Sequence, residues 1–239
     1  HTFVVGEFTG RGRYETELSV GDMKTKGVTF DRALTKGRTK ATNPGVSRFA
    51  LQEPPCLYGE DKGLTVDPYV LGFWLGDGDS DCGRVTINAV DFQEVENHLS
   101  LGNAAQQWNE RRTAVRITIP GMKTKLRQLD LLSNKHIPEE YLRSSAASRL
   151  ALLQGLMDSD GHIEATGLRA EYCTTNKSLA IGVSELLFSL GYRPRTSVGE
   201  AKLNGRVVSP KYRVRFRPQL DNPPARLQRK LDRIKPVRK

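Results

Sequence analysis

Two short stretches of the chain share one pattern of small and acidic residues, and this pattern constrains the fold more than any other feature. They cover residues 70–78 (VLGFWLGDG) and residues 153–161 (LQGLMDSDG). In each stretch two small residues stand four positions apart, an Asp follows the second of them, and a Gly follows the Asp. Residues four positions apart lie on one face of an α-helix. Each stretch therefore predicts a helix with a narrow face of small residues and a carboxylate at its C-terminal end.

The small faces of the two predicted helices are expected to pack against each other. They are formed by Gly72, Gly76, Gly155 and Ser159. Small side chains allow two helix backbones to approach closely. Such packing would place Asp77 and Asp160 side by side at one end of the helix pair. One helix of this kind most often ends in an ordinary C-terminal turn, but two matching copies favour a shared site.

Both stretches resemble the LAGLIDADG motif of homing endonucleases, and the second matches it almost letter for letter. Between them, residues 134–138 (NKHIP) resemble the Lys-x-Ile-Pro block of the intein-borne members. The likeness covers about residues 66–239. It implies an α+β fold in which two pseudo-symmetric αββαββα halves, about 67–145 and 146–239, form a saddle over a DNA duplex. Residues 1–66 are then an N-terminal extension, either a remnant of a splicing (Hint) domain or a DNA-recognition arm.

The periodicity of the chain independently predicts a duplicated α+β unit. Apolar and polar residues alternate with period two, as in strands with one wet face, at 84–89, 113–119, 169–175 and 211–217. Apolar residues recur at helical spacing at 92–101, 126–132, 177–190 and 225–234. The dipeptide Asn204-Gly205 indicates a hairpin turn. The same order of elements follows both motif helices, which is typical of an internal duplication.

The motif aspartates are the expected metal ligands. Carboxylates are hard oxygen ligands, and Mg²⁺ is usually held by one or two of them together with substrate phosphates. We therefore expect Asp77 and Asp160 to hold Mg²⁺ or Mn²⁺ and to serve catalysis, with Gly76 and Ser159 at the same helix ends contributing to the metal site. Asp158 matches the first Asp of the family motif and is expected to support the helix end only.

Two lysines are further catalytic candidates. Lys135 follows the predicted helix at 126–132, which closes the first half. Lys235 follows the predicted helix at 225–234, which closes the second half. A lysine beside a metal site can polarise the attacking water or steady the charge that develops on phosphate. The alternative is a lysine that only interacts with the negative end of a helix.

The outward residues of the predicted strands are the candidates for DNA contact, because β-ribbons fit the major groove. They are Arg84, Asn88, Arg116, Arg195, Lys211, Arg213, Arg215 and Arg217. Lys36 and Arg38 belong to a basic stretch, residues 24–48, that is either an arm along the phosphate backbone or a solvated linker.

The charge balance agrees with a nucleic-acid partner. The chain carries 37 Lys and Arg against 27 Asp and Glu, a net charge of +10, and such an excess attracts polyanions. No apolar run reaches the length of a membrane span, so we expect no membrane association. Cys56, Cys82 and Cys173 lie far apart, which favours reduced thiols in an intracellular protein of the cytoplasm or nucleoid over a zinc site.

These features predict a monomeric, site-specific double-strand DNA endonuclease, the homing endonuclease of an intein, which hydrolyses phosphodiesters at a long, near-palindromic target. The chain starts with neither Cys nor Ser and has no terminal His-Asn pair, so we do not expect it to splice as it stands. The alternative is a catalytically weak or inactive LAGLIDADG DNA-binding protein, or an RNA maturase-like derivative. Loss of either motif Asp would favour that alternative, and both are present.

Overall fold

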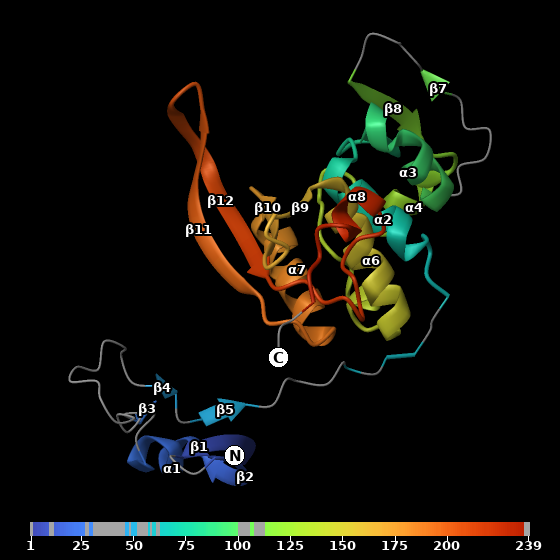
Figure 1. Ribbon diagram of the computed structural model, residues 1–239. Helices are drawn as coiled ribbons and strands as arrows, with labels where there is room; N and C mark the ends of the chain where they lie inside the picture. The colour runs from blue at the N-terminus through green and yellow to red at the C-terminus, as the bar shows by residue number, and fades with distance from the viewer. Residues whose placement is uncertain are drawn as a thin grey trace. The chain divides into compact units, whose positions relative to one another are not determined.

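The chain divides into two compact units, His1–Pro54 and Pro55–Lys239 (Figure 1). The computed structural model describes residues 2–9, 12–26, 29–30, 46–47, 49–51, 57, 59–60, 63–99, 106–107 and 113–236. The division falls earlier than the predicted boundary at residue 66. The reason is that Leu57 is held by the second unit: its amide donates a hydrogen bond of 2.9 Å to the Ser189 carbonyl, and Arg149 donates to its carbonyl.

The first unit is a small antiparallel structure. It contains β1 (Thr2–Thr9), β2 (Gly12–Ser19), α1 (Val20–Lys26), β3 (Thr29–Phe30), β4 (Val46–Ser47) and β5 (Phe49–Leu51). One sheet has the order β2-β1-β5, and β3 pairs with β4. Ser19 precedes α1 and exchanges hydrogen bonds with Asp22, a pairing that fixes the start of the helix. The predicted contact residues Lys36 and Arg38 lie outside the described residues.

The first half of the second unit begins with the first motif helix. It contains α2 (Pro68–Asp77), β6 (Arg84–Asn88), the 3₁₀ turn η1 (Ala89–Asp91), α3 (Phe92–Leu99), β7 (Gln106–Gln107), β8 (Ala114–Thr118), α4 (Met122–Gln128) and α5 (Glu139–Leu142). The sheet order is β6-β8-β7. Asp67 caps α2 by accepting a 3.1 Å hydrogen bond from the Val70 amide. Pro68 suits the first turn, where its missing N–H costs nothing.

The second half follows with a larger sheet. It contains α6 (Ala146–Ser159), β9 (Gly161–Ile163), β10 (Ala170–Thr174), α7 (Lys177–Ser189), β11 (Arg195–Leu203), β12 (Arg206–Phe216) and α8 (Gln228–Leu231). The sheet order is β11-β12-β10-β9. Asn176 caps α7 by accepting from the Leu179 amide. The predicted turn joins β11 and β12, with φ of 48° at Asn204 and 80° at Gly205.

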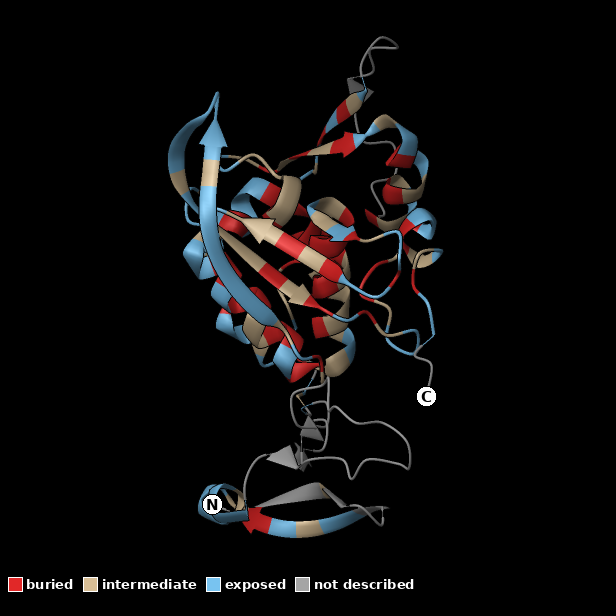
Figure 2. Cartoon of the chain, turned by 60° about the vertical axis from the view of Figure 1, so that its left-hand side comes forward, coloured by how far each residue is buried: buried red, intermediate tan, exposed pale blue. Residues whose placement is uncertain are grey.

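The fold is thus mixed α+β, and the two halves differ in their first strand. The second half runs helix, two strands, helix, two strands, helix. In the first half a single bridge between Gly78 and Val85 stands where the second half has β9. Figure 1 shows the long β11–β12 hairpin on one side of this unit and β8 on the other. Most of β11 is exposed, and the buried residues gather on the strands and helices behind it (Figure 2). No helix among the described residues is long and apolar enough to cross a bilayer.

The two motif helices, α2 and α6, form the centre of the core. A Cβ on Gly72 would overlap the carbonyl oxygen of Leu152, and a Cβ on Gly155 would overlap the carbonyl oxygen of Tyr69. Gly76 lies against the hydroxyl of Ser159. The helices therefore meet backbone to backbone through the four small residues. The rest of α2 is largely apolar and buried, whereas α6 also buries the charged residues Arg149 and Asp158 and has Ala147 exposed.

The contact predicts that even one methyl group is too large at this seam. Gly155→Ala should lower the free energy of unfolding by about 1–3 kcal/mol, the usual cost of overpacking, because the new Cβ meets backbone that cannot move aside. Gly199→Ala is the matched control, since a Cβ on Gly199, in β11, has no atom within 4 Å. Urea unfolding measures both. Equal stability of the two variants would contradict the packing described here.

Candidate active site

The helix pair brings Asp77 and Asp160 together. Asp77 is the last residue of α2, and Asp160 is the C-cap of α6. Burial, and then the charge of Asp160, raise the pKa of Asp77 to about 6. Burial also raises the pKa of Asp160, although its side chain reaches solvent. The C-terminal end of a helix carries a partial negative charge. Two such ends and two carboxylates therefore make a site of concentrated negative charge, which favours a divalent cation.

Lys135 stabilises the C-terminal end of α2. Its ammonium group donates hydrogen bonds to the carbonyls of Trp74 (3.0 Å), Leu75 (3.1 Å), Gly76 (3.3 Å) and Gly78 (2.7 Å). It also lies 4.8 Å from the centre of the Trp74 ring. The Trp74 carbonyl also accepts from the Gly78 amide (2.8 Å), and carbonyls at the C-terminal end of a helix carry partial negative charge, so a buried cation suits them. Burial lowers the pKa of Lys135 to about 8, and the charges of Asp160 and Asp77 act in the opposite direction.

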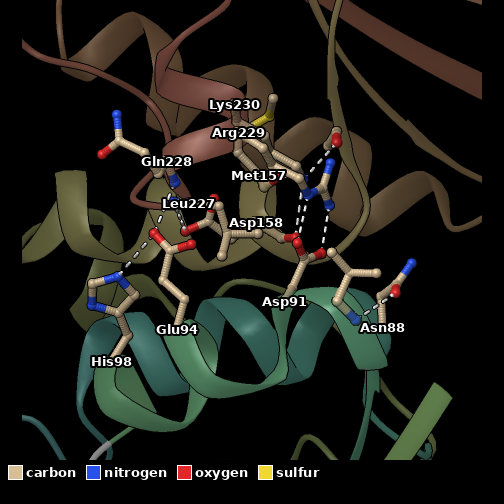
Figure 3. A network of polar contacts seen from close by, with 12 residues as sticks. Asn88, Asp91, Glu94, His98, Met157, Asp158, Leu227, Gln228, Arg229 and Lys230 are labelled. Carbon is tan, nitrogen blue, oxygen red and sulfur yellow. Dashed lines mark hydrogen bonds and ion pairs between the residues drawn. The ribbon is translucent and has the colours of Figure 1, made fainter. Parts of the chain in front are cut away.

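Lys230 plays the same part at the second helix end. Its ammonium group donates to the carbonyls of Met157, Asp158 (2.9 Å) and Gly161 (2.9 Å). Each of these carbonyls stands 83 positions after a partner of Lys135, so the contact is repeated between the halves. Burial lowers the pKa of Lys230 to about 8 as well. Figure 3 shows Lys230 above Met157 and Asp158.

The structure places Lys230, and not Lys235, at the second helix end. Lys235 is exposed and its backbone packs beside Gly167, whereas Lys230 reaches the helix end. The path of the chain from the closing helix to the buried lysine differs between the two halves. In the first half the chain continues through residues 129–134 after α4 before Lys135, while in the second half the lysine belongs to α8 itself. Matching the lysines by their distance from the closing helix therefore selected the wrong residue.

A polar network fixes the segment that carries Lys230 (Figure 3). Asp158 is buried and accepts hydrogen bonds from the Tyr69 hydroxyl (2.9 Å) and from the amides of Arg226 (2.9 Å) and Leu227 (3.2 Å). Arg229 forms two 2.6 Å hydrogen bonds with the Asp91 carboxylate at the start of α3. Asp158 therefore positions the segment that leads into α8, and it also lines the pocket that contains Asp77.

Gly76 and Ser159, the two further expected metal residues, lie in the helix seam. The Ser159 hydroxyl donates to the carbonyls of Gly155 (2.9 Å) and Leu156 (3.1 Å), so it is turned back on its own helix. The Gly76 carbonyl accepts from Lys135. Among the described residues no cluster of three or more His, Cys, Asp or Glu side chains could hold a metal ion. The donor set is thus the two aspartates, which fits Mg²⁺ or Mn²⁺ completed by phosphate and water oxygens.

The arginines predicted for the second sheet lie on its outer face. Arg195 stands directly opposite Arg215, and Arg213 lies two residues before Arg215 on the same strand face as Lys211. Glu171, on β10, stands opposite Arg215 and pairs with Arg215 (2.6 Å) and Arg213 (3.7 Å). A pocket of about 590 Å³ at the base of this face is lined by Arg169, Arg193, Arg195, Arg215 and Arg217. Like charges placed opposite each other are unfavourable, so this surface suits a polyanion.

The first sheet presents fewer charges. Arg84 and Arg116 lie on the face opposite the buried Val85 and Ile87, as predicted strand residues should. Arg84 is 3.4 Å from the Asp79 carboxylate. The side-chain oxygen of Asn88 accepts a hydrogen bond from the Val90 amide and so caps the turn that begins α3. Asn88 therefore has a structural task in addition to the DNA contact predicted for it.

Sequence patterns missed three residues of the site: Lys230, Arg229 and Tyr172. Lys230 and Arg229 stand in a short helix rich in charge, where no spacing distinguishes them from solvated neighbours. Tyr172 occupies an ordinary inward strand position. The repeat offset of 83 positions leads from Lys135 to Pro218, so the sequence repeat does not single out Lys230.

Part of the chain matches a known family. Residues 147–220, from the first turn of α6 to just beyond β12, match the family described as LAGLIDADG-like domain. The matched segment contains the second motif, with Asp158 and Asp160.

Two curated proteins of mycobacteria are similar in sequence. "Replicative DNA helicase DnaB" of Mycobacterium intracellulare is 36% identical over 157 residues, which is 65% of this chain and 24% of that protein. "Iron-sulfur cluster assembly SufBD family protein ML0593" of Mycobacterium leprae (strain TN) is 26% identical over 183 residues, 70% of this chain and 21% of that protein. The chain therefore spans a quarter or less of the length of these relatives.

Solved structures of the homing endonuclease I-DmoI are also similar. Its mesophilic variants align with a TM-score of 0.42 and 18% identity over 64% of this chain and 88% of theirs. Its complex with DNA and Mn aligns with a TM-score of 0.39 and 19% identity over 64% of this chain and 89% of that one. A likeness at this level says nothing by itself about the chemistry of this chain.

Replacing the buried lysine should destabilise the fold. Lys230→Met keeps the length of the side chain but leaves three buried carbonyls without their donor, so the free energy of unfolding should fall by about 1–3 kcal/mol. Lys235→Met, at an exposed position, should stay within about 0.5 kcal/mol of the unchanged protein. Urea titration compares the two. A larger loss of stability at Lys235 than at Lys230 would contradict the structural role given to Lys230.

Removing one carboxylate should stabilise the metal-free protein at high pH. The folded pKa of Asp77, about 6, exceeds its ordinary value of 3.8. The folded state therefore binds more protons between these values, and the stability contributed by Asp77 falls as pH rises through 6. Asp77→Asn should raise the free energy of unfolding by roughly 1 kcal/mol at pH 8, and by less at pH 4.5, where Asp77 is protonated.

Urea unfolding in EDTA at the two pH values measures this difference. Asp221→Asn, at an exposed position, is the control and should change the free energy of unfolding by no more than about 0.5 kcal/mol. If Asp77→Asn were less stable than the unchanged protein at pH 8, ionised Asp77 would not destabilise the fold.

Proposed function

We propose that the chain is a divalent-metal-dependent DNA endonuclease of the LAGLIDADG type that cuts both strands at a specific site. The observation that carries this proposal is the pair of aspartates at the ends of two helices in backbone contact, with a buried lysine beneath each end. The two aspartates come from one chain, so a monomer can form the whole site. The match of residues 147–220 to the LAGLIDADG-like domain supports the same activity.

The proposed reaction is hydrolysis of a phosphodiester. The oxygen of a water molecule bonds to phosphorus, the bond from phosphorus to one ester oxygen breaks, and a proton from the water ends on the leaving oxygen. A divalent cation between the aspartates would offset the charge that develops on the phosphate and lower the pKa of the attacking water. Asp77 and Asp160 would hold it in place. Lys135 and Lys230 fix the helix ends, and their positive charge attracts the phosphate backbone.

The distribution of charge supports DNA as the substrate. It also indicates that most of the contacts to the DNA phosphates come from the second half. Residues 146–239 contain 18 Lys and Arg against 8 Asp and Glu, whereas residues 67–145 contain 9 against 11. A basic surface gains affinity for DNA by releasing the counterions of the phosphates. The β11–β12 hairpin, exposed over most of its length, has the form of the β-ribbons that enter the major groove.

We also infer that the chain is the endonuclease part of an intein. The names of the two mycobacterial relatives describe unrelated functions, yet each shares with this chain a stretch that is a quarter or less of its length. An element inserted into different hosts would produce that pattern. The Lys-x-Ile-Pro block ahead of α6 supports the same origin. Such an element must spare DNA that already carries it, so its target would be the uninterrupted host gene.

Cleavage of host genes with and without the shared segment tests the proposal. The substrates are plasmids with the two relatives' coding sequences, each intact or with the whole inserted element, of which the shared segment is a part, removed so that the flanking host sequences are joined. In Mg²⁺ or Mn²⁺ the protein should linearise at least one of the plasmids from which the insertion has been removed. It should leave both intact coding sequences uncut. EDTA should stop the reaction, and Asp160→Asn should slow it by about 100-fold or more while binding persists.

The outcomes separate the two candidate functions. Binding to a junction without cleavage in either metal would favour an inactive DNA-binding derivative. Neither binding nor cleavage of these junctions, or of plasmid libraries of mycobacterial genomic DNA, would refute the proposal.

A further inference from the structure

Two pockets flank the paired helix ends, and each contains one of the aspartates. The Tyr172 pocket, of about 450 Å³, is lined by Asp160, Lys135, Tyr172, Asn176, Ser80 and Ser133 among others. The Ile87 pocket, of about 220 Å³, is lined by Asp77, Ile87, Asp91 and Arg229 among others. Each pocket joins residues of both halves. They are therefore two related chambers around one site.

The walls of the two pockets correspond. Ile87 and Tyr172 are inward residues on the strands that precede α3 and α7. Asp91 and Asn176 stand at the starts of those helices and hold the other half: Asp91 pairs with Arg229, and the Asn176 amide donates a 2.7 Å hydrogen bond to the Lys135 carbonyl. The pairing of Gly78 with Val85 repeats the pairing of Gly161 with Tyr172, so the residue that corresponds to Tyr172 is the buried, apolar Val85.

The Tyr172 hydroxyl is the unusual feature of this pair. Tyr172 is 1% exposed. Among the described residues its hydroxyl is the one buried side-chain polar atom without a hydrogen-bond partner. An unsatisfied buried hydroxyl costs about 1–3 kcal/mol, and native proteins rarely keep one without a use. A phenol is protonated near neutral pH, so this hydroxyl is available as a donor.

We infer that the Tyr172 pocket receives the scissile phosphate of one DNA strand, that the Tyr172 hydroxyl donates a hydrogen bond to an oxygen of that phosphate, directly or through one water, and that this strand is cut faster than the other. The inference rests on the proposed endonuclease function. No proton or electron passes to Tyr172, which serves only as a donor to the charged phosphate. Val85 stands at the position of the first half that corresponds to Tyr172, and its side chain is apolar, so the other strand meets no phenol donor there.

Separate labelling of the two strands tests the inference. The substrate is the junction duplex that the unchanged protein cuts, with the 5′ end of either strand labelled. The unchanged protein should cut one strand faster. Tyr172→Phe should slow that strand by about 100-fold, as loss of one donor to a developing charge does. The other strand should change less than threefold, so the order of cutting reverses. Tyr192→Phe is the matched control, because Tyr192 is equally buried but donates to the Asn222 carbonyl outside the site.

Folding stability gives a second readout without DNA or metal. Tyr172→Phe removes an unsatisfied hydroxyl, so the unfolding temperature should stay the same or rise. Tyr192→Phe removes a made hydrogen bond, so the unfolding temperature should fall. A loss of stability in Tyr172→Phe like that in Tyr192→Phe would mean that the hydroxyl is structural, and would overturn the inference.

The cleavage outcomes distinguish the inference from the proposed function. Equal slowing of both strands by Tyr172→Phe, or of neither, would overturn the strand-specific role while the endonuclease remains. Equal rates for the two strands in the unchanged protein would do the same. If the unchanged protein cuts neither strand of any duplex tested, the proposed function fails, and the inference fails with it.

Discussion

The close contact between α2 and α6 is the constraint on which the rest of the structure depends. Gly72 and Gly155 each face a backbone carbonyl of the opposite helix, at a distance that leaves no room for a Cβ. The contact aligns the C-terminal ends of the helices and so decides where Asp77 and Asp160 lie. Both sheets, the buried lysines and the two pockets are arranged around this pair. Without the glycines the aspartates would be separate helix ends.

The contact also creates an electrostatic cost, because it concentrates negative charge that destabilises the folded protein until a cation binds. Two negative helix ends and two carboxylates meet in one place, and the raised pKa values of Asp77 and Asp160 express that cost. Lys135 and Lys230 offset it from within by donating to the helix carbonyls, yet they do not pair directly with the carboxylates in any hydrogen bond of the described residues. The remaining charge is available to a divalent cation. Stability and activity therefore make opposite demands on the aspartates.

The two halves share a plan but differ in what they offer a ligand. The second half carries the larger sheet, the exposed hairpin and the excess of positive charge. The pockets at the shared site differ in the same sense, with Tyr172 in one and Ile87 in the other. One chain that contains both halves is free to let them diverge, whereas two identical subunits could not. An asymmetric site is thus a direct consequence of joining the halves covalently.

The sequence by itself determined the helices, most strands, the seam of small residues and the pair of aspartates, because these follow from local periodicity and from a repeated motif. The tertiary structure alone decided which lysine reaches the second helix end. Lys230 and Lys235 are both near a closing helix, and only the path of the chain distinguishes them. The structure alone also showed that Tyr172 has no partner for its hydroxyl. Burial and hydrogen bonding depend on segments far apart in the chain, which local patterns do not record.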